Sequence, residues 1–484
     1  MFKGSVWKMD NEIPKRERLT RNIVTEVAVI GAGLAGILIA DRLSAEGKKV
    51  IVLEADRIAG GQSGKTTAKI TAQHGCVYAG FKEDFGLEKA KLYAEANYNA
   101  IEWYRKCVES RGIDCDFENT DSFIYTFSEQ KKLKKEYEVC KEIGLPVELV
   151  AQTELPFKVA SAVKMKSQAQ FNPLKFIKAV SNDITVYEKT RVNTVKGNVI
   201  YCENCTVRAE HIVFACHYPF LIIPGLYFAK MYQQRSYAIA LRNAPDINGM
   251  YIGIDNEGYS FRKYQDMILL GGGGHRTGEN SAGNKYRQLH KAAKKCFPDC
   301  TEVASWSAQD CVTADGIPYI GKLSLCHPDW YVATGFAKWG MTTSAVAADI
   351  ISDLVCGREN KYSKVFSPSR FSLKSAQGIA KEMGQAVKGL VRGNFSVPPH
   401  LLSSVRIGDG GIISVNGKRV GIYRESDKKY YTVIPKCTHM GCGLEWNPDE
   451  KSWDCPCHGS RFDYTGKLID NPAQTDLKHP TELR

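Results

Sequence analysis

The sequence has little that would hold the chain in a membrane or export it. Its longest apolar run extends only from Val27 to Ala40 and contains three glycines, whereas a membrane-spanning helix needs about 20 apolar residues. The N-terminal extension, residues 1–23, is charged and lacks the apolar stretch of a secretory signal. We therefore expect a cytoplasmic protein without a transmembrane segment, in which most of the 16 cysteines are reduced thiols.

Patterns typical of nucleic-acid binding are also missing. The chain carries no arginine-rich tract and no recognised RNA-binding motif. Its net charge of +12 suits an anionic partner, but spread over 484 residues the charge is a weak signal. We expect no nucleic-acid partner.

The first strong positive signal is "TEVAVIGAGLAGILIADRLSAEGKKVIVLEAD", which begins at Thr25. It reads as a strand, a G-x-G-x-x-G turn, a helix, and a second strand that ends at Glu54. Gly31 permits the tight turn, Gly33 lets a pyrophosphate approach the backbone, and Gly36 lets the helix pack closely. The helix N-terminus favours phosphate, and Glu54 is placed to accept hydrogen bonds from a ribose. This complete unit predicts a dinucleotide-binding domain.

Beyond this unit, residues 185–274 read mostly as short strands, and a helix follows Phe336. Residues 371–397 carry a basic amphipathic pattern, with an apolar stripe that runs from Leu373 to Leu390 among lysines. We interpret this segment as a helical linker that packs between domains, and peripheral membrane contact is the alternative. The predicted domains are thus 24–370, the linker 371–397, and a small antiparallel β domain at 398–484.

The β domain contains "CTHMGC" (437–442) and "CPCHGS" (455–460). Cys437, His439, Cys455 and His458 give two cysteines and two histidines on two loops. A zinc site would use these four, but it would leave Cys442 and Cys457 unexplained.

These two loops resemble those of the Rieske proteins of respiratory and photosynthetic cytochrome complexes. The resemblance implies a 2Fe-2S cluster with Cys437, His439, Cys455 and His458 as ligands, and a disulfide between Cys442 and Cys457. Rieske oxygenases also need a mononuclear iron site, but the ten histidines include no H-x-x-x-x-H pair.

One position departs from the high-potential Rieske pattern. That pattern has S-x-Y after the second histidine, and its Ser and Tyr donate hydrogen bonds to the cluster sulfurs. Here Ser460 is present, but Phe462 stands at the Tyr position and cannot donate. Because one donor is lost, we predict a cluster of intermediate rather than high potential.

The nucleotide unit, the strand-rich middle, "TADGIPYIG" and "ATGFAKWGMT" resemble the flavoproteins of the D-amino-acid oxidase and glycine oxidase superfamily. The resemblance covers most of residues 24–357 and implies FAD. The expected fold is an α/β, Rossmann-like FAD-binding domain of the glutathione-reductase type with a mixed or antiparallel substrate sheet, followed by the all-β Rieske domain. By position, the FAD-binding residues are Gly31, Gly33, Gly36, Glu54, Ser63, Thr66, Thr67, Val192, Gly335, Met341 and Thr342.

The substrate site departs from this family. Amino-acid oxidases of the family read W-x-x-x-R-P-x-T-x-D-G, in which the Arg clamps the substrate carboxylate, whereas this chain reads "WSAQDCVTADG". Asp310 replaces that Arg and favours a neutral or cationic substrate. Arg262 is the alternative clamp, and Trp339 is a further candidate for the catalytic pocket.

Together these motifs predict a flavin-dependent dehydrogenase. A small-molecule substrate, such as an amine, would reduce FAD, and the Rieske cluster would pass electrons singly to a redox protein or a quinone. Two alternatives remain: a reductase in which electrons run from a donor through the cluster to FAD, and a non-catalytic, redox-responsive binding module.

Overall fold

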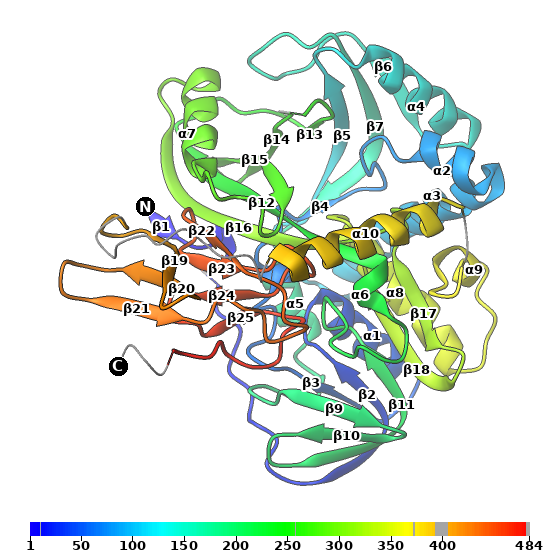
Figure 1. Cartoon of the computed structure of the whole chain (residues 1–484). Coiled ribbons are helices and arrows are strands. Elements are labelled where there is room, and N and C mark those ends of the chain that lie inside the picture. The colour runs from blue at the N-terminus through cyan, green and yellow to red at the C-terminus, as the bar shows by residue number, and fades with distance from the viewer. Residues whose placement is uncertain (10, 257, 371–372, 393–404, 481–484) are drawn as a thin grey trace.

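The computed structural model describes residues 1–9, 11–256, 258–370, 373–392 and 405–480. Two sheets with their helices form the larger part of the molecule, and a small β domain lies against it (Figure 1). Residues 1–23, predicted as an extension, are built into this larger part: β1 (Phe2–Lys3) pairs with β16 (Thr301–Thr313), and Trp7 is fully buried.

The first sheet carries the predicted nucleotide-binding unit. Its strand order is β17-β18-β11-β2-β3-β8, and β18, β11, β2, β3 and β8 are parallel. Ile30 lies beside both Leu53 and Phe214, so the carboxyl ends of three neighbouring strands meet at one edge. Helices α1 and α8 pack against each other beside this sheet. The bounds are β2 Ile23–Ile30, α1 Leu34–Ala45, β3 Val50–Leu53, β8 Val186–Tyr187, β11 Thr206–Phe214, β17 Tyr319–Ser324, β18 His327–Thr334 and α8 Gly340–Val355.

The second sheet forms the predicted substrate half. Its order is β1-β16-β12-β15-β14-β13-β5-β7-β4, with β6 added on β7, and most neighbours are antiparallel. The bounds are β4 Lys69–Ile70, β5 Glu118–Thr126, β6 Val147–Val150, β7 Ser161–Gln170, β12 Met231–Arg242, β13 Met250–Gly253, β14 Ser260–Tyr264 and β15 Met267–Arg276.

The remaining elements of the larger part include a hairpin, β9 Val192–Lys196 and β10 Val199–Cys202, which turns at Gly197 as its sequence predicts. The helices are α2 Tyr78–Phe85, α3 Leu87–Arg111, α4 Gln130–Glu142, α5 Pro173–Val180, α6 Tyr227–Lys230, α7 Lys285–Cys296 and α9 Ser363–Phe366. Asn172 caps α5 by accepting hydrogen bonds from the amides of Leu174 and Lys175.

The C-terminal domain is an antiparallel β structure, as predicted. One sheet runs β19-β20-β21 and the other β22-β23-β24-β25. Trp453, Phe462 and Leu444 are fully buried in its core, together with the cysteines of both loops. The bounds are β19 Gly410–Val415, β20 Lys418–Arg424, β21 Tyr430–Val433, β22 Glu445–Asn447, β23 Ser452–Asp454, β24 Arg461–Asp463 and β25 Leu468–Asp470.

The predicted linker contains helix α10 (Leu373–Arg392), which crosses the molecule next to α6 (Figure 1). It does pack between the two parts, but not through its apolar stripe. The buried positions are Ser375, Glu382 and Gly389, whereas Met383 and Val387 are more than half exposed. These two residues of the apolar stripe therefore do not make the contact between the two parts. Residues 393–397 of the predicted linker lie outside the described part of the chain.

Candidate functional site

A cavity of about 310 Å³ opens at the carboxyl edge of the parallel sheet. This edge is where α/β folds bind nucleotides, and the volume lies within the usual range for ligand pockets. The lining includes eight of the predicted FAD-binding residues: Gly31, Gly33, Glu54, Ser63, Thr66, Val192, Gly335 and Met341.

The glycine turn has the close packing that its sequence predicts. Gly31 has φ +107°, and a Cβ there would lie 2.7 Å from the Ala215 carbonyl oxygen. A Cβ on Gly36 would lie 1.9 Å from the Gly31 carbonyl oxygen, so only glycine lets α1 approach the turn. Gly33 caps α1, and Leu34 and Ala35 of its first turn line the cavity. This backbone fits a pyrophosphate.

Glu54 closes the other side of the turn. Its carboxylate accepts hydrogen bonds from the Ala32 and Asp56 amides, both at 2.8 Å. Burial raises the pKa of this carboxyl, and the two amides oppose that rise. Ser63 accepts a hydrogen bond from the Leu34 amide through Oγ at 2.8 Å, which ties the 60–67 loop to the start of α1. Glu54 is thus fixed where it can accept hydrogen bonds from a ribose.

The lining of the cavity also includes Asp310 and Lys338. Burial raises the pKa of the Asp310 carboxyl, while the positive charge of Lys338 lowers it. Ala337 and Lys338 both have left-handed backbones, with φ +49° and +79°. Consecutive non-glycine residues in this region are strained, and such strain is concentrated at functional sites. Asp310 was predicted from the sequence, whereas Lys338 was not.

Five predicted residues do not line the cavity: Gly36, Thr67, Thr342, Trp339 and the alternative clamp Arg262. Arg262 is buried on β14 and donates to the carbonyl oxygens of Thr67 and Ala68 at 2.7 and 2.8 Å. Its guanidinium therefore braces the 60–70 segment, and this geometry speaks against a substrate clamp.

Trp339, the remaining catalytic candidate, also lies outside the lining. Its ring stacks on His74 at a centroid distance of 4.6 Å, and the Thr342 hydroxyl lies 3.2 Å from His74 Nε2. Burial lowers the pKa of His74 to about 3, so this ring is neutral at physiological pH. Trp339, His74 and Thr342 form a packed support at the start of α8 rather than a pocket wall.

The second site lies between the two loops of the β domain. Cys437, Cys455 and His458 are buried, and His439 is half-buried with its ring 5.0 Å from that of His458. Among the described residues, neither ring nitrogen of His458 nor Nδ1 of His439 has a hydrogen-bond partner. Buried polar atoms are rarely left unpaired, so these nitrogens fit metal ligation. Two free imidazoles beside two cysteines match the donor set of a Rieske cluster.

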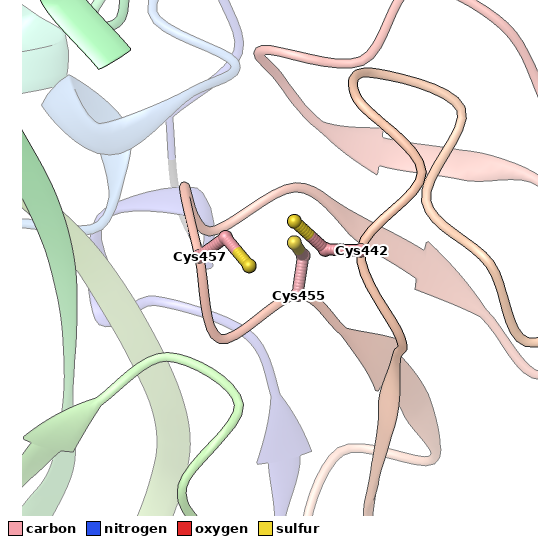
Figure 2. Close-up of side chains that lie close together, drawn as sticks. All are labelled: Cys442, Cys455 and Cys457. Carbon is pink, nitrogen blue, oxygen red and sulfur yellow. The ribbon is translucent and has the colours of Figure 1, made fainter. Parts of the chain in front are cut away.

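The other two cysteines come from the same loops. The Sγ atoms of Cys442, Cys455 and Cys457 lie within 4.8 Å of one another, and Figure 2 shows Cys442 facing the other two across the gap between the loops. All three are free thiols in the structure. The disulfide between Cys442 and Cys457 therefore stays a prediction. Ser460 is fully buried beside this site, as is Phe462, which offers no hydroxyl.

The two sites share a wall, which the sequence did not reveal. Ile469, Asp470, Asn471 and Gln474 of the C-terminal domain line the cavity of the larger part. Gln233 on β12 donates through Nε2 to the carbonyl oxygens of both His458, at 2.7 Å, and Asn471, at 3.1 Å. One side chain thus connects the cavity wall to the second cluster loop. Gln309 on β16 reinforces this link by donating to the Gly459 carbonyl oxygen at 2.9 Å.

Buried charges hold the same interface. Arg235 on β12 is 1% exposed and pairs with Glu450 of the C-terminal domain at 2.5 Å. Arg461 joins Asp454 and Asp470, each at 3.0 Å. Burial alone would raise the pKa of the Glu450 carboxyl, but Arg235 and Arg461 lower it to about 2. The feature of the sequence that could have indicated this interface is "QQRSY" (233–237), a polar run inside a strand whose other residues are mostly apolar.

Comparison with known proteins agrees with this division. Residues 26–354 match the family model "FAD dependent oxidoreductase" (DAO), and residues 401–481 match the model "Rieske [2Fe-2S] domain". Among the described residues, no helix is both long and apolar enough to cross a membrane.

Relatives include the "Putative Rieske 2Fe-2S iron-sulfur protein YhfW" of Bacillus subtilis (strain 168). It is 36% identical over 98% of this chain and 96% of its own length. Gamma-glutamylputrescine oxidoreductase of Escherichia coli (strain K12) is 22% identical over 73% of this chain and 88% of its own. The match to the crystal structure of glycine oxidase from Geobacillus kaustophilus covers 72% of this chain and 99% of that chain, with a TM-score of 0.61. The two sequences are 20% identical, so the likeness is one of fold.

The matched models thus agree with the fold of the two parts. The larger part binds FAD, and the C-terminal domain binds a 2Fe-2S cluster. The chain is therefore a redox enzyme that belongs to the FAD-dependent oxidoreductase (DAO) family and carries a C-terminal Rieske domain.

Proposed function

We propose that this enzyme oxidises a small amine, or another neutral or cationic substrate, at FAD. The electrons then pass singly through the Rieske cluster to an external carrier, either a redox protein or a quinone. The observation that carries the proposal is the shared wall: Asp470 and Asn471 line the flavin cavity, and Gln233 bonds Asn471 and His458 together. A cluster bound this close to the flavin has an evident use as its electron outlet.

The substrate class follows from the cavity charges. Asp310 stands where the related amino-acid oxidases have a carboxylate-binding Arg, and Arg262 is engaged with backbone carbonyls. A substrate carboxylate would therefore meet an anion at this position, whereas an amine would be attracted to it. The likeness to a relative named for gamma-glutamylputrescine, itself an amine, points to the same class.

In amine oxidation the carbon–nitrogen bond becomes an imine, and the substrate loses a hydride equivalent and a proton. FAD supplies the two-electron acceptor for this step, and the cluster accepts one electron at a time. We assign Asp310 to substrate orientation. The Gly31–Gly36 turn, Glu54 and Ser63 hold the ADP half, and Cys437, His439, Cys455 and His458 hold the iron. Each oxidised substrate then requires two turnovers of a one-electron carrier.

The two histidines of the cluster site have different surroundings. His458 is 2% exposed and lies under the larger part, with the Phe228 ring at 5.8 Å, whereas His439 is only half-buried. We infer that electrons enter on the His458 side and leave on the His439 side, because a carrier in solution can approach only His439.

Anaerobic mixing of the purified holoenzyme with a panel of amines, amino acids and hydroxy acids tests this function. A true substrate should bleach the flavin absorbance and then produce the EPR signal of the reduced cluster. In His458→Ala the flavin should still bleach without that signal. If the flavin of the native enzyme bleached while its cluster stayed oxidised, internal transfer would be disproved. Reduction of the flavin only by donors that first reduce the cluster would instead establish the reductase direction.

A further inference from the structure

Helix α10 buries small and polar residues and exposes large apolar ones, whereas most surface helices do the reverse. Its buried positions, Ser375, Glu382 and Gly389, are small or polar and recur every seven residues. Gly389 lies against the cluster loops: a Cβ there would lie 2.2 Å from the Cys457 Sγ, and its carbonyl oxygen accepts a hydrogen bond from the Gly443 amide. Glu382 forms an ion pair with Arg276 at 2.6 Å. The helix is thus anchored firmly without using its large apolar residues.

Those large residues face solvent instead. Met383, Val387 and Leu390 are 54%, 58% and 38% exposed, and their spacing puts them on one side of the helix. In a globular protein such a stripe normally faces the core. The loop that enters α6, which packs against α10, adds Ile222, Ile223 and Leu226, of which Ile223 is 77% exposed. We call these six residues the α10 surface; Figure 1 shows α6 and α10 side by side.

The polar face of α10 is basic. Lys381 and Lys388 are exposed on the side of the helix opposite the apolar stripe, and the chain as a whole carries +12. A helix of 20 residues is about 30 Å long, and an exposed apolar stripe with lysines is the pattern of helices that lie in a membrane surface.

We propose that the α10 surface docks on an anionic membrane, with α10 lying in the plane of the headgroups. This docking surface is independent of which substrate the flavin oxidises. Because Gly389 contacts the cluster loops, docking brings the cluster close to the bilayer, where a carrier dissolved in lipid can reach it. The proposal therefore favours a quinone among the carriers considered above.

Sedimentation of the holoenzyme with vesicles tests the docking without reference to turnover. The native protein should pellet with vesicles that contain phosphatidylglycerol and much less with pure phosphatidylcholine, and salt should weaken the binding. The variant Met383→Gln/Val387→Gln/Leu390→Gln should reduce the vesicle partition coefficient at least about tenfold, because the apolar contact is lost. Lys381→Gln/Lys388→Gln should reduce it about threefold to tenfold.

A matched control uses exposed apolar residues elsewhere. Val24, Phe127 and Leu149 are 68%, 48% and 45% exposed, and replacing all three by Gln should leave vesicle binding unchanged. Flavin absorbance and the cluster EPR signal should be native in every variant, which establishes folding. Failure of the native holoenzyme to bind anionic vesicles would overturn the proposal. A dimer in solution that the α10 triple variant dissociates would also overturn it, since a second copy would then cover this surface.

Discussion

The two cofactor sites of this chain are built by different means. The flavin site rests on backbone: a glycine turn, a helix N-terminus and a few amide hydrogen bonds form its ADP end. The cluster site rests on four side chains on two loops, two of them histidines with three buried ring nitrogens that have no hydrogen-bond partner in the described part of the chain. A site made of backbone requires space at a few positions, whereas a site made of ligands requires particular atoms. Substitutions should therefore damage the two sites in different ways.

The largest expected effect is at the cluster. Cys455→Ser should abolish the Rieske EPR signal, because a hydroxyl does not replace a thiolate on iron, while FAD stays bound. Cys326→Ser is the matched control, since Cys326 is an exposed free thiol outside both sites. Loss of FAD together with the cluster would show that the two sites do not fold independently. EPR and flavin absorbance of the same sample provide the measurement.

Next in size is the interface that joins the two regions. Arg235→Met removes one of the two arginines that pair with the buried Glu450 and leaves only Arg461, so we expect a loss of about 3 kcal/mol in the free energy of unfolding. Adding Glu450→Gln should recover much of that loss, because the uncompensated charge is removed. Chemical denaturation followed by flavin fluorescence measures both. Equal stability of the single and double variants would contradict a net electrostatic role for this pair.

Low pH should weaken the interface between the C-terminal domain and the larger part. The folded pKa of Glu450 is about 2, below its ordinary value of 4.5, so its charge contributes stability that is fully present above pH 4.5. That contribution, at most about 3 kcal/mol, should be lost as the pH falls from 4.5 towards 2. Thermal unfolding of native protein and Glu450→Gln across this range measures it. The variant should show a flatter pH dependence, and parallel curves would refute the assignment.

A smaller effect is expected at the glycine turn. Gly36→Ala would place a Cβ 1.9 Å from the Gly31 carbonyl oxygen, so α1 must shift. We expect a loss of about 1–3 kcal/mol of stability and weaker FAD retention, with an intact cluster signal. Gly384→Ala on α10 is the control, because a Cβ there meets nothing within 4 Å. Titration of apoprotein with FAD compares the two variants.

The smallest expected effect is a shift in the reduction potential of the cluster. Phe462→Tyr adds a hydroxyl at the position where high-potential Rieske proteins have a donor, and an extra hydrogen bond of about 0.5–1.5 kcal/mol raises a one-electron potential by roughly 20–65 mV. Potentiometry with EPR detection measures the shift. An unchanged or lower potential would mean that the new hydroxyl does not reach a sulfur.

Most of the local chemistry was predictable from the sequence. The G-x-G-x-x-G turn and the cluster loops are short motifs in which a few adjacent residues carry the function, so their spacing alone indicates the structure. The antiparallel C-terminal domain and the hairpin at Gly197 follow from alternation and turn residues for the same reason. The FAD-binding fold and the Rieske domain were expected on this basis and are confirmed.

The tertiary structure alone decided how the two regions meet. Gln233, Arg235 and Gln309 read as unremarkable polar residues on strands, and their partners lie 150 or more residues away in the chain. Arg262 was a candidate substrate clamp until its backbone acceptors were seen, and the amphipathic pattern of α10 did not show which of its faces is exposed. Sequence patterns show which face of an element is apolar or charged. They do not show what lies opposite that face, because contacts between distant segments depend on the complete packing.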